Sequence, residues 1–327
     1  MALRQQALFA HQARPHRNRT AADVAFLERP TASIVSPLRY PGSKRRFASY
    51  IAHTLELNDL DPASLFVEAF AGGASVALQL LNDEKVEEIG LADADPLVAS
   101  FWQTVFWDAE WLVRRVETMQ VTLRQWHHFR RYVWTDRRDR AIACLFLNRT
   151  SYSGILAPDA GPIGGQAQTS NYSIDCRFPR ETLVRRIRQA AALRDRVAFV
   201  WNCTWSETLA RMKRMERHGT LPRRKTFLYF DPPFFEKADA LYAHCFDDAE
   251  HRNFRDAVLR IGRPWLISYD AAPMAERLYG KRARHVKVEQ LYSTSGWTGQ
   301  KAQHEVIITN LDVVPSATRV WRRSEDW

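Results

Sequence analysis

The chain has 327 residues, of which 46% are hydrophobic and 26% are charged, as is typical of a globular protein with one large domain or two modest ones. Charged residues interrupt every apolar run before it reaches the length of a membrane span, which argues against a membrane protein. The four cysteines are far apart and none has metal-ligand spacing, so we expect reduced thiols, a reducing compartment and no metal site.

The first third of the chain alternates expected strands and helices. Residues 1–36 are polar, basic and weakly periodic, which predicts a flexible arm before ordered structure begins near Pro37. The elements expected next are a strand at 65–68, a turn at 69–73, a helix at 74–82, a strand at 86–92 and a helix at 97–107. This alternation is typical of a parallel, doubly wound sheet.

A basic, helical segment then interrupts the alternation. Helices are expected at 123–133, 138–147 and 181–193, with a Gly-, Pro- and Ser-rich loop at 151–173. The pattern resumes with strands at 197–201, 226–230 and 265–268, helices at 207–217, 249–261 and 273–279, and a hairpin around 296–299. We expect an α/β fold whose Rossmann-like, doubly wound sheet is built by residues 37–107 and 195–313, with a helical insert at 108–194 and a tail at 314–327.

The net charge of +10 is concentrated in one contiguous part of the chain. Between Glu110 and Lys225 there are 23 Lys and Arg against 10 Asp and Glu, out of 47 and 37 in the whole chain, which leaves 24 against 27 elsewhere. One contiguous basic third indicates a polyanionic partner, with nucleic acid favoured over an anionic membrane. A set of solvated helix faces is the alternative interpretation.

The residues Asp231-Pro232-Pro233-Phe234 directly follow the apolar run 226–230. Neither proline can donate a ladder hydrogen bond, so the strand ends here and delivers a carboxylate, a backbone carbonyl and an aromatic ring to the sheet edge where ligands bind. Two acceptors and a stacking face suit a flat base that carries an amino group. A proline-stopped strand whose aspartate caps the next turn is the alternative.

The segment Glu68-Ala69-Phe70-Ala71-Gly72-Gly73-Ala74 lies between an expected strand and helix. Glycines there allow the backbone to approach a ligand closely, and the helix N-terminus adds partial positive charge. Asp93 ends the next strand about twenty residues later, where a carboxylate can accept both hydroxyls of a ribose. Together they indicate an adenosine-containing cofactor, with a helix cap as the alternative role of Asp93. The missing Gly-x-Gly-x-x-Gly pattern argues against a nicotinamide cofactor.

Two further segments carry candidate ligand-binding groups. Residues 38–46 form a basic turn that leads into a helix and could cover an adenine ring. Residues 147–154 lie in the basic segment, where arginines can neutralise phosphates and Asn or Arg can read base edges. Most of the aromatic residues upstream have helical spacing and are expected in the core: Trp126, Phe129, Tyr132 and Trp134.

Taken in order, these segments resemble the Dam-type adenine-specific DNA methyltransferases over residues 37 to 311. The matching stretches are 39–44, 67–76, 91–96, 146–154, 229–234, 266–270 and 293–310. Asp-Pro-Pro-aromatic alone occurs in other amino methyltransferases, whereas the order of cofactor motifs, basic insert and catalytic strand is specific. The resemblance implies methyl transfer from S-adenosyl-L-methionine to adenine N6 in double-stranded DNA, with the insert recognising the target.

The resemblance also implies roles for individual residues. The expected catalytic residues are Asp231, Pro232 and Phe234. The expected cofactor contacts are Tyr40, Gly42, Lys44, Phe70, Gly72, Asp93 and Asp231. The expected nucleic-acid contacts, taken with the basic segment, are Arg130, Arg131, Asn148, Arg149 and Tyr152. Two positions depart from the family, because Phe234 stands where tyrosine is usual and Ala74 where a third glycine is usual.

The expected mechanism turns the target adenine out of the duplex, at a cost of about a few kcal/mol, and stacks it on Phe234. Asp231 and the carbonyl of Pro232 then accept the two amino hydrogens. We expect a monomer or weak dimer in the cytoplasm of a bacterium, or encoded by a phage, with a role in restriction, repair or regulation left open. The alternatives are an RNA base methyltransferase and a nucleic-acid-binding relative with weakened catalysis.

Overall fold

The computed structural model describes residues 33–39, 43–221, 225–233, 246–270, 273–293 and 300–321. Three expected site residues lie outside these ranges, namely Tyr40, Gly42 and Phe234. Most of the expected N-terminal arm, the tip of the expected hairpin and the last six residues, 322–327, also lie outside them.

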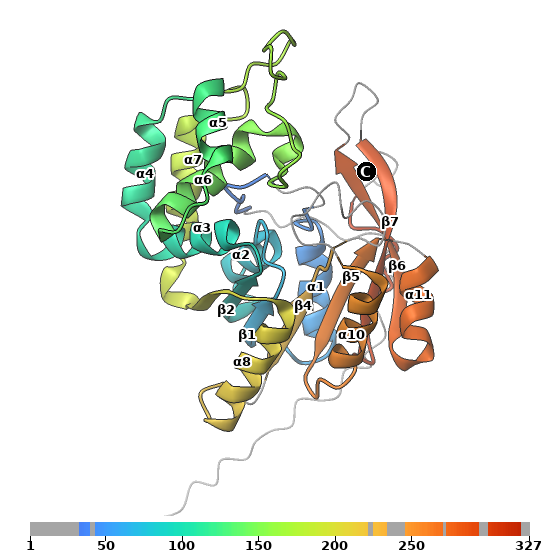
Figure 1. Ribbon diagram of the computed structural model, residues 1–327. Helices are drawn as coiled ribbons and strands as arrows, with labels where there is room; N and C mark the ends of the chain where they lie inside the picture. The colour runs from blue at the N-terminus through green and yellow to red at the C-terminus, as the bar shows by residue number, and fades with distance from the viewer. Residues whose placement is uncertain are drawn as a thin grey trace, which may run out of the picture.

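Over the described residues a mixed seven-stranded sheet has the order β3-β2-β1-β4-β5-β7-β6 (Figure 1). Neighbouring strands from β3 to β5 are parallel, whereas β7 is antiparallel to both β5 and β6. The strands are β1 (Ala63–Glu68), β2 (Val86–Asp93), β3 (Val197–Asn202), β4 (Thr226–Phe230), β5 (Trp265–Asp270), β6 (Arg284–Ser293) and β7 (Gln300–Thr309). The expected α/β fold is confirmed.

Helices cover both faces of this sheet, as in a doubly wound fold. Alternate residues of the strands enter two hydrophobic cores, with Phe66 and Tyr229 in the first and Val67 and Phe230 in the second. The first core includes α1 (Phe47–Leu57), α2 (Ser75–Asn82) and α3 (Pro96–Trp107), and the second includes α8 (Trp205–Arg217), α10 (Asp248–Val258) and α11 (Pro273–Tyr279). Strands buried on both faces explain the uninterrupted apolar run at 226–230.

Four helices lie between α3 and β3 in the chain and gather at the upper left of Figure 1. They are α4 (Ala109–Thr118), α5 (Leu123–Arg131), α6 (Arg137–Thr150) and α7 (Arg180–Ala191). Both α6 and α7 contact α3, and the buried side chains of all four helices join the first core. The helical segment is therefore packed onto the sheet domain through a shared core.

The helix boundaries differ from the expected ones by small amounts that have local causes. Glu207 was expected to begin a helix, but α8 begins at Trp205 because Thr204 and Glu207 form a reciprocal capping box. Helix α4 has no counterpart among the expected elements. No helix among the described residues combines the length and the apolar character needed to cross a membrane.

Both ends of the described chain pack against the domain. Ile34 is buried in the first core, so packed structure begins before Pro37. At the other end, the Glu289 N–H donates to the Thr318 carbonyl and the Val320 N–H donates to the Glu289 carbonyl, which joins the start of the tail to β6.

Candidate active site

The carboxyl ends of four neighbouring parallel strands bring acidic residues to one edge of the sheet. Glu68 ends β1, Asp93 ends β2, Asp231 directly follows β4 and Asp270 ends β5. The sheet order places these strands side by side as β2-β1-β4-β5. Ligands of open α/β sheets bind outside this edge, so the candidate site lies here.

Asp231 is held from two sides through one of its oxygens. Lys44 Nζ lies 3.0 Å from Asp231 Oδ1, and the Ser268 hydroxyl donates to the same oxygen at 2.8 Å. The hydroxyls of Tyr229 and Ser268 are 2.8 Å apart. Burial raises the pKa of Tyr229 well above its usual value, so Tyr229 stays protonated and donates to Ser268. These contacts orient the carboxylate, and neither the Lys44 contact nor the Ser268 contact involves Oδ2.

Lys44 is buried between two carboxylates. Besides Asp231, its Nζ lies 3.5 Å from Glu305 Oε1 on β7. Burial raises the pKa of Glu305 to about 8, and the charge of Lys44 acts in the opposite direction. A buried ammonium requires compensating charge, so Lys44 ties the chain before α1 to the end of β4 and to the middle of β7.

Asp93 orients the loop that follows β1. Its Oδ2 accepts the Gly72 N–H at 2.8 Å, and its Oδ1 accepts the Asp95 N–H at 2.9 Å. Burial, followed by the nearby carboxylate of Asp95, raises the pKa of Asp93 to about 7. Asp95 is the N-cap of α3 and accepts the Leu97 N–H at 2.8 Å, so the alternative role of a helix cap belongs to Asp95 instead.

Glu68 adds a further carboxylate between the other two. It is 4% exposed and accepts the Ala77 N–H at 3.2 Å. Burial is the largest cause that raises its pKa well above the usual value, and the carboxylates of Asp231 and Asp93 raise it further. Because the carboxylates of Asp231 and Asp93 disfavour the ionisation of Glu68, a cationic ligand beside Glu68 would be favoured. Among the described residues no group of three or more His, Cys, Asp or Glu side chains could hold a metal ion.

An aromatic wall supports the same loop. The ring of Phe70 meets those of Phe246 and Phe254 edge-on, with 5.8 Å between centroids in each case. Trp205 packs against Phe254 at 5.2 Å. This wall gives the site an apolar side beside its acidic side.

The loop also contains an alanine in a left-handed conformation. Ala74 has φ +47°, which costs an L-residue about 1–2 kcal/mol, and glycine avoids most of this cost. The substitution Ala74→Gly also removes a buried methyl group and makes the unfolded chain more flexible, and both effects offset part of the gain. We therefore expect Ala74→Gly to raise the free energy of unfolding, measured by urea denaturation, by about 0.5–1 kcal/mol. The control Ala77→Gly, inside α2, is expected to lower it by about 1 kcal/mol. Equal destabilisation by both substitutions would contradict the inference that the backbone of Ala74 is strained.

The predicted nucleic-acid residues divide into two groups. Arg131 and Tyr152 are exposed, whereas Asn148 and Arg149 are 0% and 4% exposed and bind within the protein. Arg130 is half-buried, and its guanidinium donates to the backbone carbonyls of residues 156 and 160 at 2.9 and 3.0 Å. The structure therefore turns three of the five predicted contacts inward, although they lie in a basic segment that suggested a surface.

The aromatic residues near them divide in a similar way. Trp126 and Phe129 are buried, as their helical spacing predicted. Tyr132 is 59% exposed, and it directly follows α5, which ends at Arg131.

Ser268 and Glu305 belong to the site but were not predicted from the sequence. Ser268 lies near the end of β5, which pairs with β4, so its place at a strand end was the available signal. Glu305 reaches the site because β7 pairs antiparallel with β5 and sets Glu305 opposite Asp270. That pairing is a tertiary feature, and no local pattern in the sequence reveals it.

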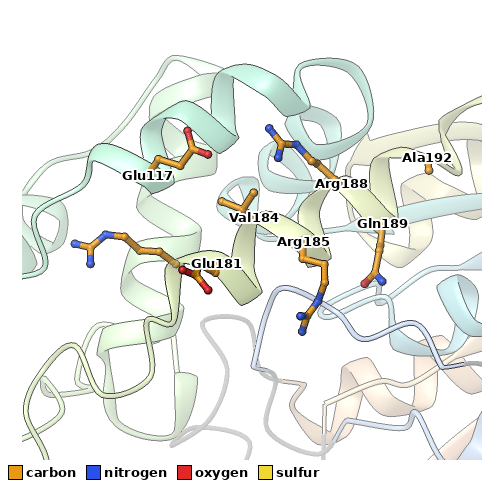
Figure 2. Close-up of a pocket in the computed structure, with 8 residues that line it drawn as sticks. Glu117, Glu181, Val184, Arg185, Arg188, Gln189 and Ala192 are labelled. Atoms are coloured by element: carbon orange, nitrogen blue, oxygen red, sulfur yellow. The ribbon is translucent and has the colours of Figure 1, made fainter.

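A groove of about 840 Å³ lies elsewhere, on the outer side of the insert between α4 and α7 (Figure 2). Its lining carries both signs of charge, with Arg185 and Arg188 beside Glu117 and Glu181. None of the carboxylates at the sheet edge lines it, so it is separate from the candidate site.

Comparison with solved structures gives distant likenesses. A putative RNA methyltransferase from Pyrococcus horikoshii is 8% identical, with a TM-score of 0.40 and coverage of 88% of this chain and 91% of that chain. A precorrin-6y C5,15-methyltransferase from Geobacter metallireducens is 11% identical, with a TM-score of 0.33 and coverage of 80% and 87%. These low scores carry no argument about this chain.

Comparison of the sequence with protein families is more informative. No curated protein matches the chain. Residues 40–174 match the family model of the D12 class N6 adenine-specific DNA methyltransferase. The matched part contains Lys44, the loop after β1, Asp93 and helices α4 to α6. The predicted resemblance is thereby confirmed for residues 40–174, which match the D12 class of N6 adenine-specific DNA methyltransferases, and this match supports methyltransferase activity with S-adenosylmethionine as the methyl donor.

Proposed function

We propose that the chain is a site-specific DNA adenine N6-methyltransferase that acts on an adenine turned out of the duplex. The observation that carries this proposal is the Asp231 carboxylate, fixed through Oδ1 at the carboxyl end of β4 and followed by Pro232. The family description supports adenine N6 as the acceptor.

The residues of the sheet edge fit S-adenosylmethionine. The Asp93 carboxylate matches the two hydroxyls of a ribose, and the carboxylates of Glu68 and Asp231 favour a ligand with cationic sulfonium and ammonium groups. Phe70 and Gly72 belong to the loop that Asp93 orients, and we propose that both line the cofactor site. When bound, S-adenosylmethionine supplies an electrophilic methyl group and a neutral thioether leaving group.

The groups of Asp231 and Pro232 suit an exocyclic amine. The lone pair of adenine N6 is spread into the purine ring, so the nitrogen needs help to become a nucleophile. We propose that Asp231 Oδ2 and the Pro232 carbonyl accept its two hydrogens and direct the lone pair out of the ring plane, while the ring stacks on Phe234. Lys44 and Ser268 hold Oδ1 and so keep Oδ2 aimed. One amino proton leaves to water after the transfer.

We further propose that residues 108–194 form the target-recognition insert and that 37–107 and 195–313 form the catalytic domain. The insert is basic, and the exposed residues Arg131 and Tyr152 lie on its surface. Arg130 instead holds residues 156 and 160, so its proposed effect on nucleic acid is indirect.

The salt dependence of DNA binding separates these two arginines. Arg131→Ala is expected to reduce the slope of log K against log salt by about one unit, because one phosphate contact is lost. Arg130→Ala is expected to leave the slope unchanged and to lower the unfolding temperature, since its backbone contacts are lost. Fluorescence anisotropy at several salt concentrations measures both slopes. If Arg130→Ala reduced the slope and Arg131→Ala did not, the phosphate contact would be at Arg130.

The pKa of Asp93 makes cofactor binding depend on pH. Because its pKa is about 7, the ionised fraction that accepts ribose hydroxyls rises with pH. The dissociation constant of S-adenosylmethionine is expected to increase about tenfold from pH 8 to pH 6. Asp93→Asn is expected to bind more weakly at pH 8 and to lose most of this dependence. Calorimetry with both proteins tests the expectation, and an identical pH dependence in the variant would contradict it.

A methyl-transfer assay tests the proposed function and separates DNA from RNA. Duplex DNA and structured RNA of matched sequence are incubated with methyl-labelled S-adenosylmethionine, and the nucleosides are identified by mass spectrometry. We expect label in N6-methyladenine from DNA. Label in RNA alone, or in a base other than adenine, would overturn the proposal.

A further inference from the structure

Residues 33–39 form a segment without helix or strand that leads along the chain toward Lys44. The side chains of Ile34 and Leu38 anchor it, at 6% and 5% exposure. Its backbone polar groups need partners that regular secondary structure does not supply. Because Lys44 holds Asp231, the placement of this segment bears on the catalytic carboxylate.

Asn148, near the end of α6, holds Arg39 in this segment by both of its backbone groups. Asn148 Oδ1 accepts the Arg39 N–H at 2.7 Å, and Nδ2 donates to the Arg39 carbonyl at 2.7 Å and to the Gly154 carbonyl at 2.8 Å. The side-chain amide of Asn148 thus pairs with both backbone polar groups of Arg39, as the backbone of a neighbouring β-strand would. Gly154 has φ +79°, and a Cβ at this position would lie 2.3 Å from the Arg39 carbonyl oxygen. The turn can approach Arg39 this closely because residue 154 is glycine.

Arg149 and Arg186 hold the two residues that precede Leu38. Arg149 Nε donates to the Pro37 carbonyl at 2.8 Å, and its Nη2 donates to the same oxygen. Arg186, on α7, donates to the Ser36 carbonyl at 3.5 Å. Burial, followed by the charges of Arg186 and Arg39, lowers the pKa of Arg149 to about 9. A buried cation beside like charges is costly, and here its hydrogen bonds serve to hold the segment.

We propose that Asn148 and Arg149 are positioning residues that couple the insert to the catalytic edge by holding residues 36–39, and through them Lys44, in place. Figure 1 shows this segment, in blue, against the insert helices. The affinity for S-adenosylmethionine then depends on the insert even without nucleic acid. If the insert also binds DNA, which rests on the proposed function, the binding of DNA and of S-adenosylmethionine affect one another by the same factor.

Three variants and a matched control test this coupling. Asn148→Ala removes the amide, Arg149→Met removes the guanidinium, and Gly154→Ala forces the turn away from Arg39. Asn58→Ala is the control, because Asn58 Nδ2 also donates to two backbone carbonyls, Thr54 at 2.8 Å and Val313 at 2.7 Å, outside the insert. Thermal unfolding establishes that each variant is folded.

Calorimetry with S-adenosylmethionine alone gives the primary result. We expect the dissociation constant to rise about tenfold in those of Asn148→Ala, Arg149→Met and Gly154→Ala that are folded, which corresponds to the loss of about one hydrogen bond. We expect it to stay unchanged in Asn58→Ala, although the unfolding temperature of this control falls by a similar amount. Unchanged affinity in folded Asn148→Ala and Arg149→Met would overturn the proposal. An equal loss in Asn58→Ala would also overturn it, because a general structural effect would then explain the result.

A second arm adds duplex DNA. We expect DNA to change the affinity of the wild type for S-adenosylmethionine and this effect to approach zero in Asn148→Ala. If Asn148→Ala or Arg149→Met reduced the salt slope of DNA binding by about one unit and left the affinity for S-adenosylmethionine unchanged, the substituted residue would be a direct phosphate contact. That result would overturn the positioning role. A wild type that binds no DNA would contradict the proposed function, whereas calorimetry with S-adenosylmethionine alone would still test the positioning role of Asn148 and Arg149.

Discussion

Methyl transfer by Asp231→Asn is expected to fall about 10³-fold at saturating substrates, with DNA binding largely retained. The amide keeps the shape of the side chain but removes the negative acceptor that draws on the amino hydrogens. It also changes the partner of the Lys44 ammonium, which now lies 3.0 Å from a carboxylate oxygen. Initial rates with labelled donor at saturation measure the loss in kcat.

Asp61→Asn is a matched control for this variant. Asp61 also precedes a proline and lies 3.2 Å from a lysine, Lys85, but it lies two residues before β1, at the opposite end of that strand from Glu68. We expect its kcat to equal that of the wild type. A rate for Asp231→Asn within a few-fold of the wild type would remove Asp231 from the mechanism.

Lys44→Met is expected to lower the free energy of unfolding by about 3–5 kcal/mol, because it removes the positive charge 3.0 Å from partly buried Asp231 and 3.5 Å from buried Glu305. The loss should grow as the pH rises. Glu305 already has a folded-state pKa raised to about 8, so the native state binds more protons than the unfolded state and stability falls toward high pH. Removing Lys44 raises this pKa further. Urea denaturation at pH 6 and pH 9 measures both effects.

The second substitution Glu305→Gln separates the charge effect from packing. The double variant Lys44→Met, Glu305→Gln is expected to be more stable than Lys44→Met alone, because the buried carboxylate is gone. Lys85→Met is the control, since Lys85 also bridges two carboxylates, at 2.6 and 3.2 Å, but is partly exposed. It is expected to cost less than about 1 kcal/mol. Equal losses for Lys44→Met and Lys85→Met would contradict the account of Lys44.

The strand ends of the site were predictable from the sequence because local chemistry defines them. Prolines stop β4 at Asp231, and a helix start at Pro96 defines the turn after Asp93. Ser268 and Glu305 could not be assigned to the site, because their place depends on how β5 pairs with β4 and β7.

The inward turn of Asn148 and Arg149 also lies beyond sequence patterns. Residues 141–150 of α6 are buried on every side, so polar and charged side chains there have only the protein as surroundings. In the sequence the same residues lie in a strongly basic segment, which favours a surface interpretation. The difference arises because both residues donate hydrogen bonds to carbonyls of residues 37 and 39, more than one hundred positions earlier in the chain.

The central claim is that Asp231, aimed by Lys44 and Ser268, directs a methyl group to adenine N6 in DNA. The most direct measurement compares genomic DNA from cells that express the wild type or Asp231→Asn, by nucleoside mass spectrometry and by sequencing that detects modified adenines. We predict N6-methyladenine at one short recognition sequence with the wild type and background levels with the variant. Equal N6-methyladenine in both, or a methylated base other than adenine, would contradict the account.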